Sequence, residues 1–213
     1  MQEFVDIRIS ELLSSRLCHE LASPIGAINN GIEMVEEFDD SMVGEAMPLI
    51  ASSARMVASR LAFYRMAYGA AGNRSIASFA DLIELANGYF AEGRTTIVWP
   101  DEPDATEMKD GWLRLLLNML PLAADTLPRG GTLAVSCEEE DGGLRMAVAA
   151  EGEGARVSEE CDQAMKTGVS PDDLTPRSVH AFWVSRLAQQ LRSRIEIDTG
   201  YADRITFSAH LNR

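Results

Sequence analysis

The chain has 213 residues, of which 46% are hydrophobic and 24% charged, a composition typical of a folded protein with one large or two small domains. The chain has a net charge of −14 and therefore lacks the excess of basic residues that nucleic-acid binding requires. We predict no nucleic-acid partner. No apolar run reaches the roughly 20 residues that span a bilayer and no secretory leader is visible, so we predict a cytoplasmic protein with no membrane contact.

Residues 5 to about 38 are predicted to form one long helix, because apolar side chains recur there every three or four positions. These positions are Ile9, Leu13, Leu17, Leu21, Pro24, Ile28, Ile32 and Val35. A proline inside a helix removes one backbone hydrogen bond, so we expect a kink at Pro24.

A second helix, over 43–68, carries a heptad pattern with alternating spacings of four and three. The positions are Val43, Met47, Ile50, Ala54, Val57, Leu61, Tyr64 and Tyr68. Two helices joined by a short loop form an antiparallel hairpin, and a lone hairpin leaves such a seam uncovered. We therefore expect a homodimer in which two hairpins form a four-helix bundle. The alternative is that the seam packs on the second half of the same chain.

Gly69–Asn73 interrupts the helical pattern and predicts a boundary between domains 1–72 and 73–213. Beyond it, helices are expected at 78–92, 107–127 and 176–191, and strands at 95–99, 131–138, 144–150, 194–199 and 203–211. Gly-Gly pairs at 130–131 and 142–143 bound the second strand, and the latter indicates a hairpin turn. The predicted fold class is α+β: a helical hairpin followed by an α/β sandwich with helices on one face of a sheet.

His19 lies two residues after Leu17 and therefore points away from the apolar seam. Its face of the helix carries mostly small side chains: Leu12, Ser15, Arg16, Ala22, Ser23, Gly26, Ala27 and Asn30. Such a stripe lets another macromolecule bring a reactive group to the ring, and a neutral imidazole is a nucleophile. The alternative is a surface histidine whose small neighbours serve helix packing. We predict no metal site, because Ser23 stands where an HExxH zinc motif needs its second histidine.

The run His19-Glu20-Leu21-Ala22-Ser23-Pro24 resembles the H-box of dimerising histidine kinases. The segments RLCHELASPIGAINNGIE and SARMVASRLAFYRMAYGAAG (53–72) are similar to the ChpT-type histidine phosphotransferases. The resemblance implies that His19 is a phosphoacceptor and that Glu20 orients or deprotonates a ring, unless it is only a solvated helix charge. Arg16 either offsets phosphate charge or is simply exposed. Receiver domains are expected to bind the His19 face (Arg16, Ala22, Ser23, Gly26, Ala27, Asn30) and parts of the second helix (Arg60, Arg65).

The second half resembles the ATP-binding domain of those kinases with its key residues replaced. On an ungapped comparison, Asn118 matches the first asparagine of the N-box, but Leu122 stands at the magnesium position and Ala150 at the adenine-reading aspartate. The phosphate-loop helix contains Ser178, His180, Phe182 and Trp183, so that no glycine lets the backbone approach a triphosphate. A four-residue shift would place Asn118 at the magnesium position, but it would restore neither the aspartate nor the glycines. The resemblance therefore predicts a degenerate domain that binds no ATP.

Without ATP, the phosphoryl group has to come from another protein. The resemblance implies a phosphorelay intermediate: His19 accepts a phosphoryl group from the receiver domain of a hybrid histidine kinase and passes it to response regulators. No cofactor is expected to bind stably, and the receiver would supply Mg²⁺. The alternatives are an ATP-dependent histidine kinase with divergent nucleotide boxes and a non-catalytic dimeric scaffold.

Overall fold

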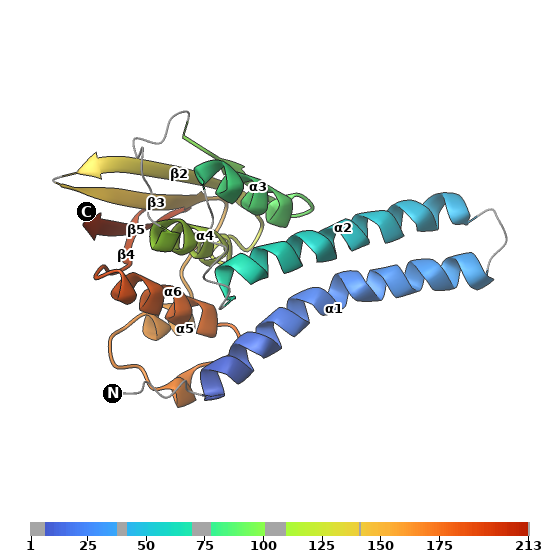
Figure 1. Ribbon diagram of the computed structural model, residues 1–213, viewed down its shortest axis with the longest axis horizontal. Helices are drawn as coiled ribbons and strands as arrows, with labels where there is room; N and C mark the ends of the chain where they lie inside the picture. The colour runs from blue at the N-terminus through green and yellow to red at the C-terminus, as the bar shows by residue number, and fades with distance from the viewer. Residues whose placement is uncertain (1–6, 38–41, 70–77, 101–109, 141, 213) are drawn as a thin grey trace.

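The structure is a computed structural model that describes residues 7–37, 42–69, 78–100, 110–140 and 142–212. Two helices, α1 (Ile7–Glu37) and α2 (Val43–Ala67), form an antiparallel hairpin that projects from the rest of the chain (Figure 1). Both predicted helices are thus confirmed, whereas most of the short loop predicted between them lies outside the described residues. Buried Pro24 lies within α1, and the helix bends along its length, as the proline predicts (Figure 1).

The two helices of the hairpin approach each other closely where α1 carries a glycine. A Cβ atom at Gly31 would lie 2.6 Å from Cγ1 of Ile50 on α2, and Ala46 is buried one turn away. Small residues on facing helices allow this close packing. Glycine therefore serves helix packing at this position, although it lowers the intrinsic stability of a helix.

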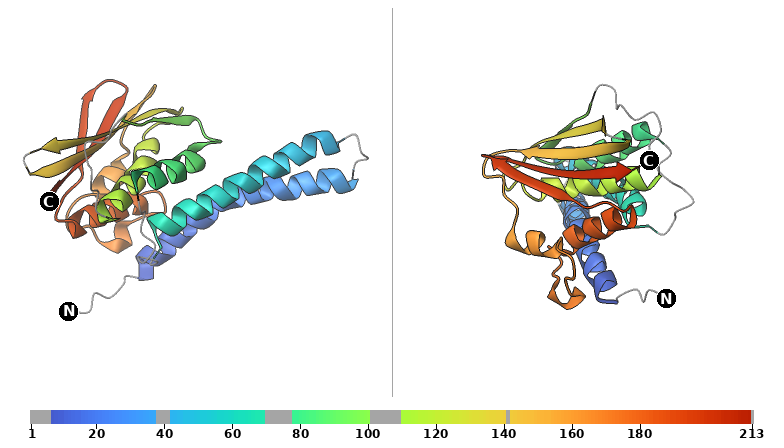
Figure 2. Two further views of the ribbon diagram at one scale, coloured as in Figure 1. Left: turned by 45° about the horizontal axis from the view of Figure 1, so that its top comes forward. Right: turned by 90° about the vertical axis from the view of Figure 1, so that its left-hand side faces the viewer.

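The C-terminal region, described over residues 78–100, 110–140 and 142–212, forms one five-stranded sheet with helices on one side (Figure 2). Its helices are α3 (Phe79–Phe90), α4 (Asp110–Ala124), α5 (Glu159–Ala164), a 3-10 helix (Pro171–Asp173) and α6 (Val179–Gln190), and its strands are β1 (Thr95–Val98), β2 (Gly131–Glu140), β3 (Gly143–Glu151), β4 (Glu196–Tyr201) and β5 (Arg204–Asn212). The strand order is β1-β2-β3-β5-β4; β1 and β2 are parallel and the other neighbours are antiparallel.

The main core lies between this sheet and α4 and α6. Every residue from Leu115 to Ala123 on α4 is buried. Strand β2 buries Leu133, Val135 and Cys137 in alternation, as expected for a strand with one face on the core. The near half of the hairpin, which is the half next to the C-terminal region, packs against α3, α4 and α6 of that region.

The predicted fold class, α+β with an N-terminal hairpin and a C-terminal sandwich, is confirmed. All five strands and the three further helices lie where the sequence places them, within a few residues. Gly142 adopts a φ of +82° beside the β2–β3 hairpin turn, as its position in a Gly-Gly pair predicts. Neither α5 nor the 3-10 helix is predicted from the sequence. Most of the predicted boundary at 69–73 lies outside the described residues.

Candidate functional site

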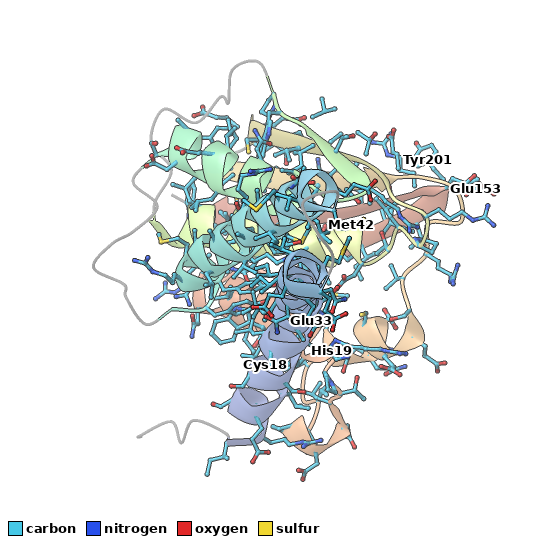
Figure 3. All side chains as sticks on the ribbon, turned by 90° about the vertical axis from the view of Figure 1, so that its right-hand side faces the viewer. Cys18, His19, Glu33, Met42, Glu153 and Tyr201 are labelled. Atoms are coloured by element: carbon cyan, nitrogen blue, oxygen red, sulfur yellow. The ribbon has the colours of Figure 1, made fainter. Side chains whose placement is uncertain are left out.

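His19 lies on the near half of α1 with its side chain exposed, as predicted (Figure 3). Its neighbours on the same helix include exposed Ser15, Ala22, Ser23 and Asn30, while Gly26 and Ala27 are half-buried. An accessible ring bordered by short side chains can be approached by a reactive group from another molecule.

Leu12 does not lie on the exposed face predicted around His19, which is a correction to the sequence prediction. It is only 3% exposed and belongs to the apolar core, so it does not line the surface around His19. The reason is that the first turns of α1 pack on the C-terminal region, where α1 contacts α6 and the 3-10 helix. The accessible stripe therefore extends from Ser15 toward the distal end of the helix.

Glu20 follows His19 in the chain, but its carboxylate is bound to three other side chains. Oε1 accepts a hydrogen bond of 2.9 Å from Nε of Arg16, and Oε2 accepts one of 2.9 Å from the hydroxyl of Tyr89 on α3. Oε2 also accepts a hydrogen bond from the hydroxyl of Tyr64 on α2. The carboxylate thus links α1 to α2 and to the C-terminal region.

Arg16 is not the freely exposed side chain that was one of its two predicted states. Its side chain is 13% exposed and forms a second ion pair, 2.9 Å long, between Nη2 and Oδ2 of Asp125, directly after α4. Burial by itself lowers the pKa of Arg16, but the charges of Asp125 and Glu20 outweigh it and hold the pKa above its ordinary value. The guanidinium therefore stays charged and anchors α1 to the C-terminal region.

The two arginines predicted on α2 have different surroundings. Arg60 is half-buried, and its Nη1 donates a hydrogen bond to the backbone carbonyl of Glu20. Arg65 is exposed at an open groove of about 560 Å³ between α2 and α3, where Asp81 and Glu84 also lie. Of the two, Arg65 has the more accessible charge.

The residues predicted at the nucleotide-box positions are largely buried. Leu122, Ala150 and Phe182 are at most 5% exposed and belong to the core. Asn118 is fully buried, and its Nδ2 donates hydrogen bonds to the carbonyls of Arg114 and Ala67, at 2.8 and 3.3 Å. Asn118, predicted from the sequence at an N-box position, thus binds the last turn of α2.

His180 links the same helices. Its Nε2 lies 3.0 Å from the backbone carbonyl of Asn118, which can only accept, so Nε2 carries the hydrogen. Nδ1 then accepts the hydrogen bond of 2.7 Å from the hydroxyl of Tyr68 at the end of α2. Burial, with the charge of Arg16, lowers the pKa of His180 to about 3, so the ring is neutral.

Several of these partners have no signal in the sequence. Tyr64 and Tyr68 enter the predicted seam only as large side chains, and nothing in the pattern assigns partners to their hydroxyl groups. Tyr89 on α3 and Asp125 directly after α4 lie 69 and 109 positions along the chain from Glu20 and Arg16, respectively.

Within the part of the chain that the structure describes, no group of three or more His, Cys, Asp and Glu side chains is arranged to hold a metal ion. In the same residues, no helix has the length and apolar character needed to cross a membrane.

The chain is similar to known proteins over nearly its full length. Residues 79–203 match the family described as the histidine phosphotransferase C-terminal domain. The protein phosphotransferase ChpT of Brucella abortus (strain 2308) is 36% identical over 203 residues, 94% of each chain. A structure described as that of a bacterial phosphotransferase superposes with a TM-score of 0.81, at 34% identity and over 97% of both chains. With this family match over more than half of its length, the chain belongs to the ChpT-type histidine phosphotransferases.

Proposed function

We propose that this protein is the histidine phosphotransfer intermediate of a phosphorelay. The exposed imidazole of His19, on an accessible stripe of a helical hairpin, is the observation that carries the proposal. The donor is the phosphorylated receiver domain of a hybrid histidine kinase, and the acceptors are response-regulator receivers. We expect the protein to act in the cytoplasm, with neither nucleic acid nor a membrane among its partners.

The chemistry of each step follows from the two groups involved. A ring nitrogen of His19 attacks the phosphorus of an aspartyl phosphate, forming an N–P bond while the P–O bond to the aspartate breaks. The carboxylate leaves with the electron pair, and the other ring nitrogen keeps its hydrogen. Transfer to a second receiver reverses this sequence. Because the transition state is loose, positioning and charge neutralisation supply most of the catalysis, and the receiver contributes Mg²⁺.

We further propose that the protein transfers phosphate without binding ATP. Leu122 and Ala150 offer no oxygen to a metal ion or to adenine, and both are core residues. The N-terminal turn of α6 contains His180, whose two ring nitrogens are already bound to Asn118 and Tyr68. These contacts support a structural role for the degenerate domain.

The proposed receiver surface consists of the accessible stripe of α1 and the neighbouring side of α2. Short side chains let a receiver approach His19 closely: Ala22, Ser23, Gly26, Ala27 and Asn30. Arg65 offers an exposed positive charge to an acidic partner. Arg16 and Arg60 act there indirectly, because both hold Glu20.

We also propose a homodimer built on the hairpin. Its distal part exposes several large apolar side chains: Ile25, Ile32, Val35, Met47 and Leu49. The C-terminal region does not reach this part of the hairpin (Figure 1). A second hairpin of the same kind would cover these residues in a four-helix bundle.

The function is tested with purified wild type, His19→Ala and the control His210→Ala, which removes an exposed histidine from β5. Each protein receives either a ³²P-labelled phosphorylated receiver or labelled ATP with Mg²⁺, and acid-labile, base-stable label on the chain is measured. We expect label from the receiver in wild type and control, none in His19→Ala, and none from ATP. Label from ATP would make the protein a kinase. No label from either source on the wild type would leave the scaffold function.

A further inference from the structure

The surroundings of Glu20 are inconsistent with a role as the base that acts on His19. Consecutive side chains on a helix point about 100° apart. The His19 ring is exposed, whereas the Glu20 carboxylate faces α2 and α3, where three donors surround it. A general base must reach its proton within roughly 2.6–3.2 Å. The hydrogen bonds of Glu20 are instead made with groups that hold helices together.

The three donors to Glu20 come from three different elements. Arg16 lies one turn earlier on α1 and also binds Asp125 after α4, while Tyr64 lies on α2 and Tyr89 on α3. Tyr64 is 6% exposed, and its ring packs edge-on against that of Tyr89 with centroids 5.9 Å apart. Burial raises the pKa of both phenols, so both keep the hydrogens that they donate.

We propose that Glu20 is a positioning residue, which fixes the C-terminal region against the helix that carries His19. This inference rests on the proposed phosphotransfer function. The C-terminal region flanks α1 close to His19, because Asp125 binds the residue one turn away and α6 contacts the same helix. A receiver that reaches the imidazole therefore contacts one surface that is formed by both α1 and the C-terminal region. The orientation of that surface depends on the hydrogen bonds to Glu20.

The test removes the hydroxyl groups while leaving the carboxylate in place. The double variant Tyr64→Phe/Tyr89→Phe loses both phenolic donors but keeps Glu20 and its ion pair with Arg16. Tyr201→Phe is the matched control, because Tyr201 is 68% exposed on β4. Transfer from a labelled phosphorylated receiver is measured at several receiver concentrations, and hydrogen–deuterium exchange is measured over α3.

We expect the double variant to raise KM for the receiver about tenfold, the effect of losing charge-assisted hydrogen bonds that hold the docking surface. The value of kcat should stay within about twofold, because the chemistry at His19 is untouched. Exchange over α3 should become faster. Tyr201→Phe should behave like wild type in all three measurements. Glu20→Gln should raise KM similarly and keep kcat within about tenfold.

Opposite results would identify Glu20 as a base. In that case Glu20→Gln lowers kcat by about 100-fold or more and flattens the pH profile, while the double variant leaves KM unchanged. If the double variant does not fold, Tyr89→Phe alone provides the same comparison. If wild type takes no label from any receiver, the proposed function fails, and the exchange over α3 still decides whether Glu20 fixes the two parts of the chain. Unchanged hydrogen–deuterium exchange over α3 in both Tyr64→Phe/Tyr89→Phe and Glu20→Gln overturns the inference.

Discussion

The imidazole of His180 is held in one tautomer by partners from two other helices. Its Nε2–H donates to Asn118 on α4, and its Nδ1 accepts from Tyr68 at the end of α2. A buried polar group is tolerated when its hydrogen bonds are satisfied, but a buried imidazolium without a counter-charge is costly. The His180 side chain thus links the hairpin to the C-terminal region only while its ring is neutral.

This neutrality predicts a pH dependence of stability. The pKa of His180 is about 3 in the folded chain, because burial and the charge of Arg16 oppose protonation, against about 6.5 in an unfolded chain. Between these values the unfolded state binds the additional proton, so the free energy of unfolding falls as the pH drops below 6.5. The slope of this contribution approaches about 1.4 kcal/mol per pH unit.

The measurement is urea unfolding of wild type and His180→Gln between pH 7.5 and pH 5, monitored by circular dichroism. The carboxylates titrate in both proteins, so the difference between the two curves isolates His180. We expect the wild type to lose stability faster than the variant as the pH falls. Parallel curves would show that His180 is protonated without penalty in the folded chain.

At the scale of single elements, α1 carries two glycines in different surroundings. A Cβ at Gly31 would lie 2.6 Å from Ile50, whereas one at Gly26 would meet nothing within 4 Å. Gly26→Ala should therefore stabilise the chain by about 0.5–1 kcal/mol through helix propensity. Gly31→Ala should destabilise it by about 1–3 kcal/mol, because the hairpin must open to admit the methyl group. Urea unfolding of both variants checks this, and equal effects would contradict the close contact.

The elements themselves are predictable because their signals are local. The spacing of apolar residues indicates α1 and α2 almost to their ends, and alternation with glycine pairs indicates β2 and β3. The six-residue helix α5 is too short to show a period, although Ser158 caps it by accepting from the backbone N–H of Cys161. The seam of α2 is predicted as one surface, but its near end, with Tyr64, packs on the C-terminal region while Met47 is exposed.

The site is only half predictable. The exposure of His19 follows from its offset relative to Leu17 on one helix. The partners of Glu20 do not follow, because Tyr64 and Tyr89 lie 44 and 69 positions away and are brought to it by tertiary packing. Helical periodicity gives the direction of a side chain from its own helix but does not identify the element that it meets.

At the scale of the whole molecule, the near and distal halves of the hairpin have different surroundings. The near half contacts the C-terminal region through Glu20, Arg16 and Tyr68. The distal half projects away from it (Figure 2) and exposes apolar side chains, among them Met47 at 52% and Ile32 at 43%. Exposed apolar residues grouped in one part of a molecule are typical of an interface with another protein surface.

This distribution predicts that the protein is a dimer held by the distal hairpin. Size-exclusion chromatography with light scattering should give twice the mass of one chain at micromolar concentration. Ile32→Asp/Met47→Asp should give the mass of a single chain, because burying two uncompensated carboxylates in a bundle costs more than the interface gains. Val98→Asp is the matched control, since Val98 is equally exposed, at 55%, but lies on β1; it should remain a dimer. A wild type with the mass of one chain would contradict the prediction, and the exposed seam would then need a different partner.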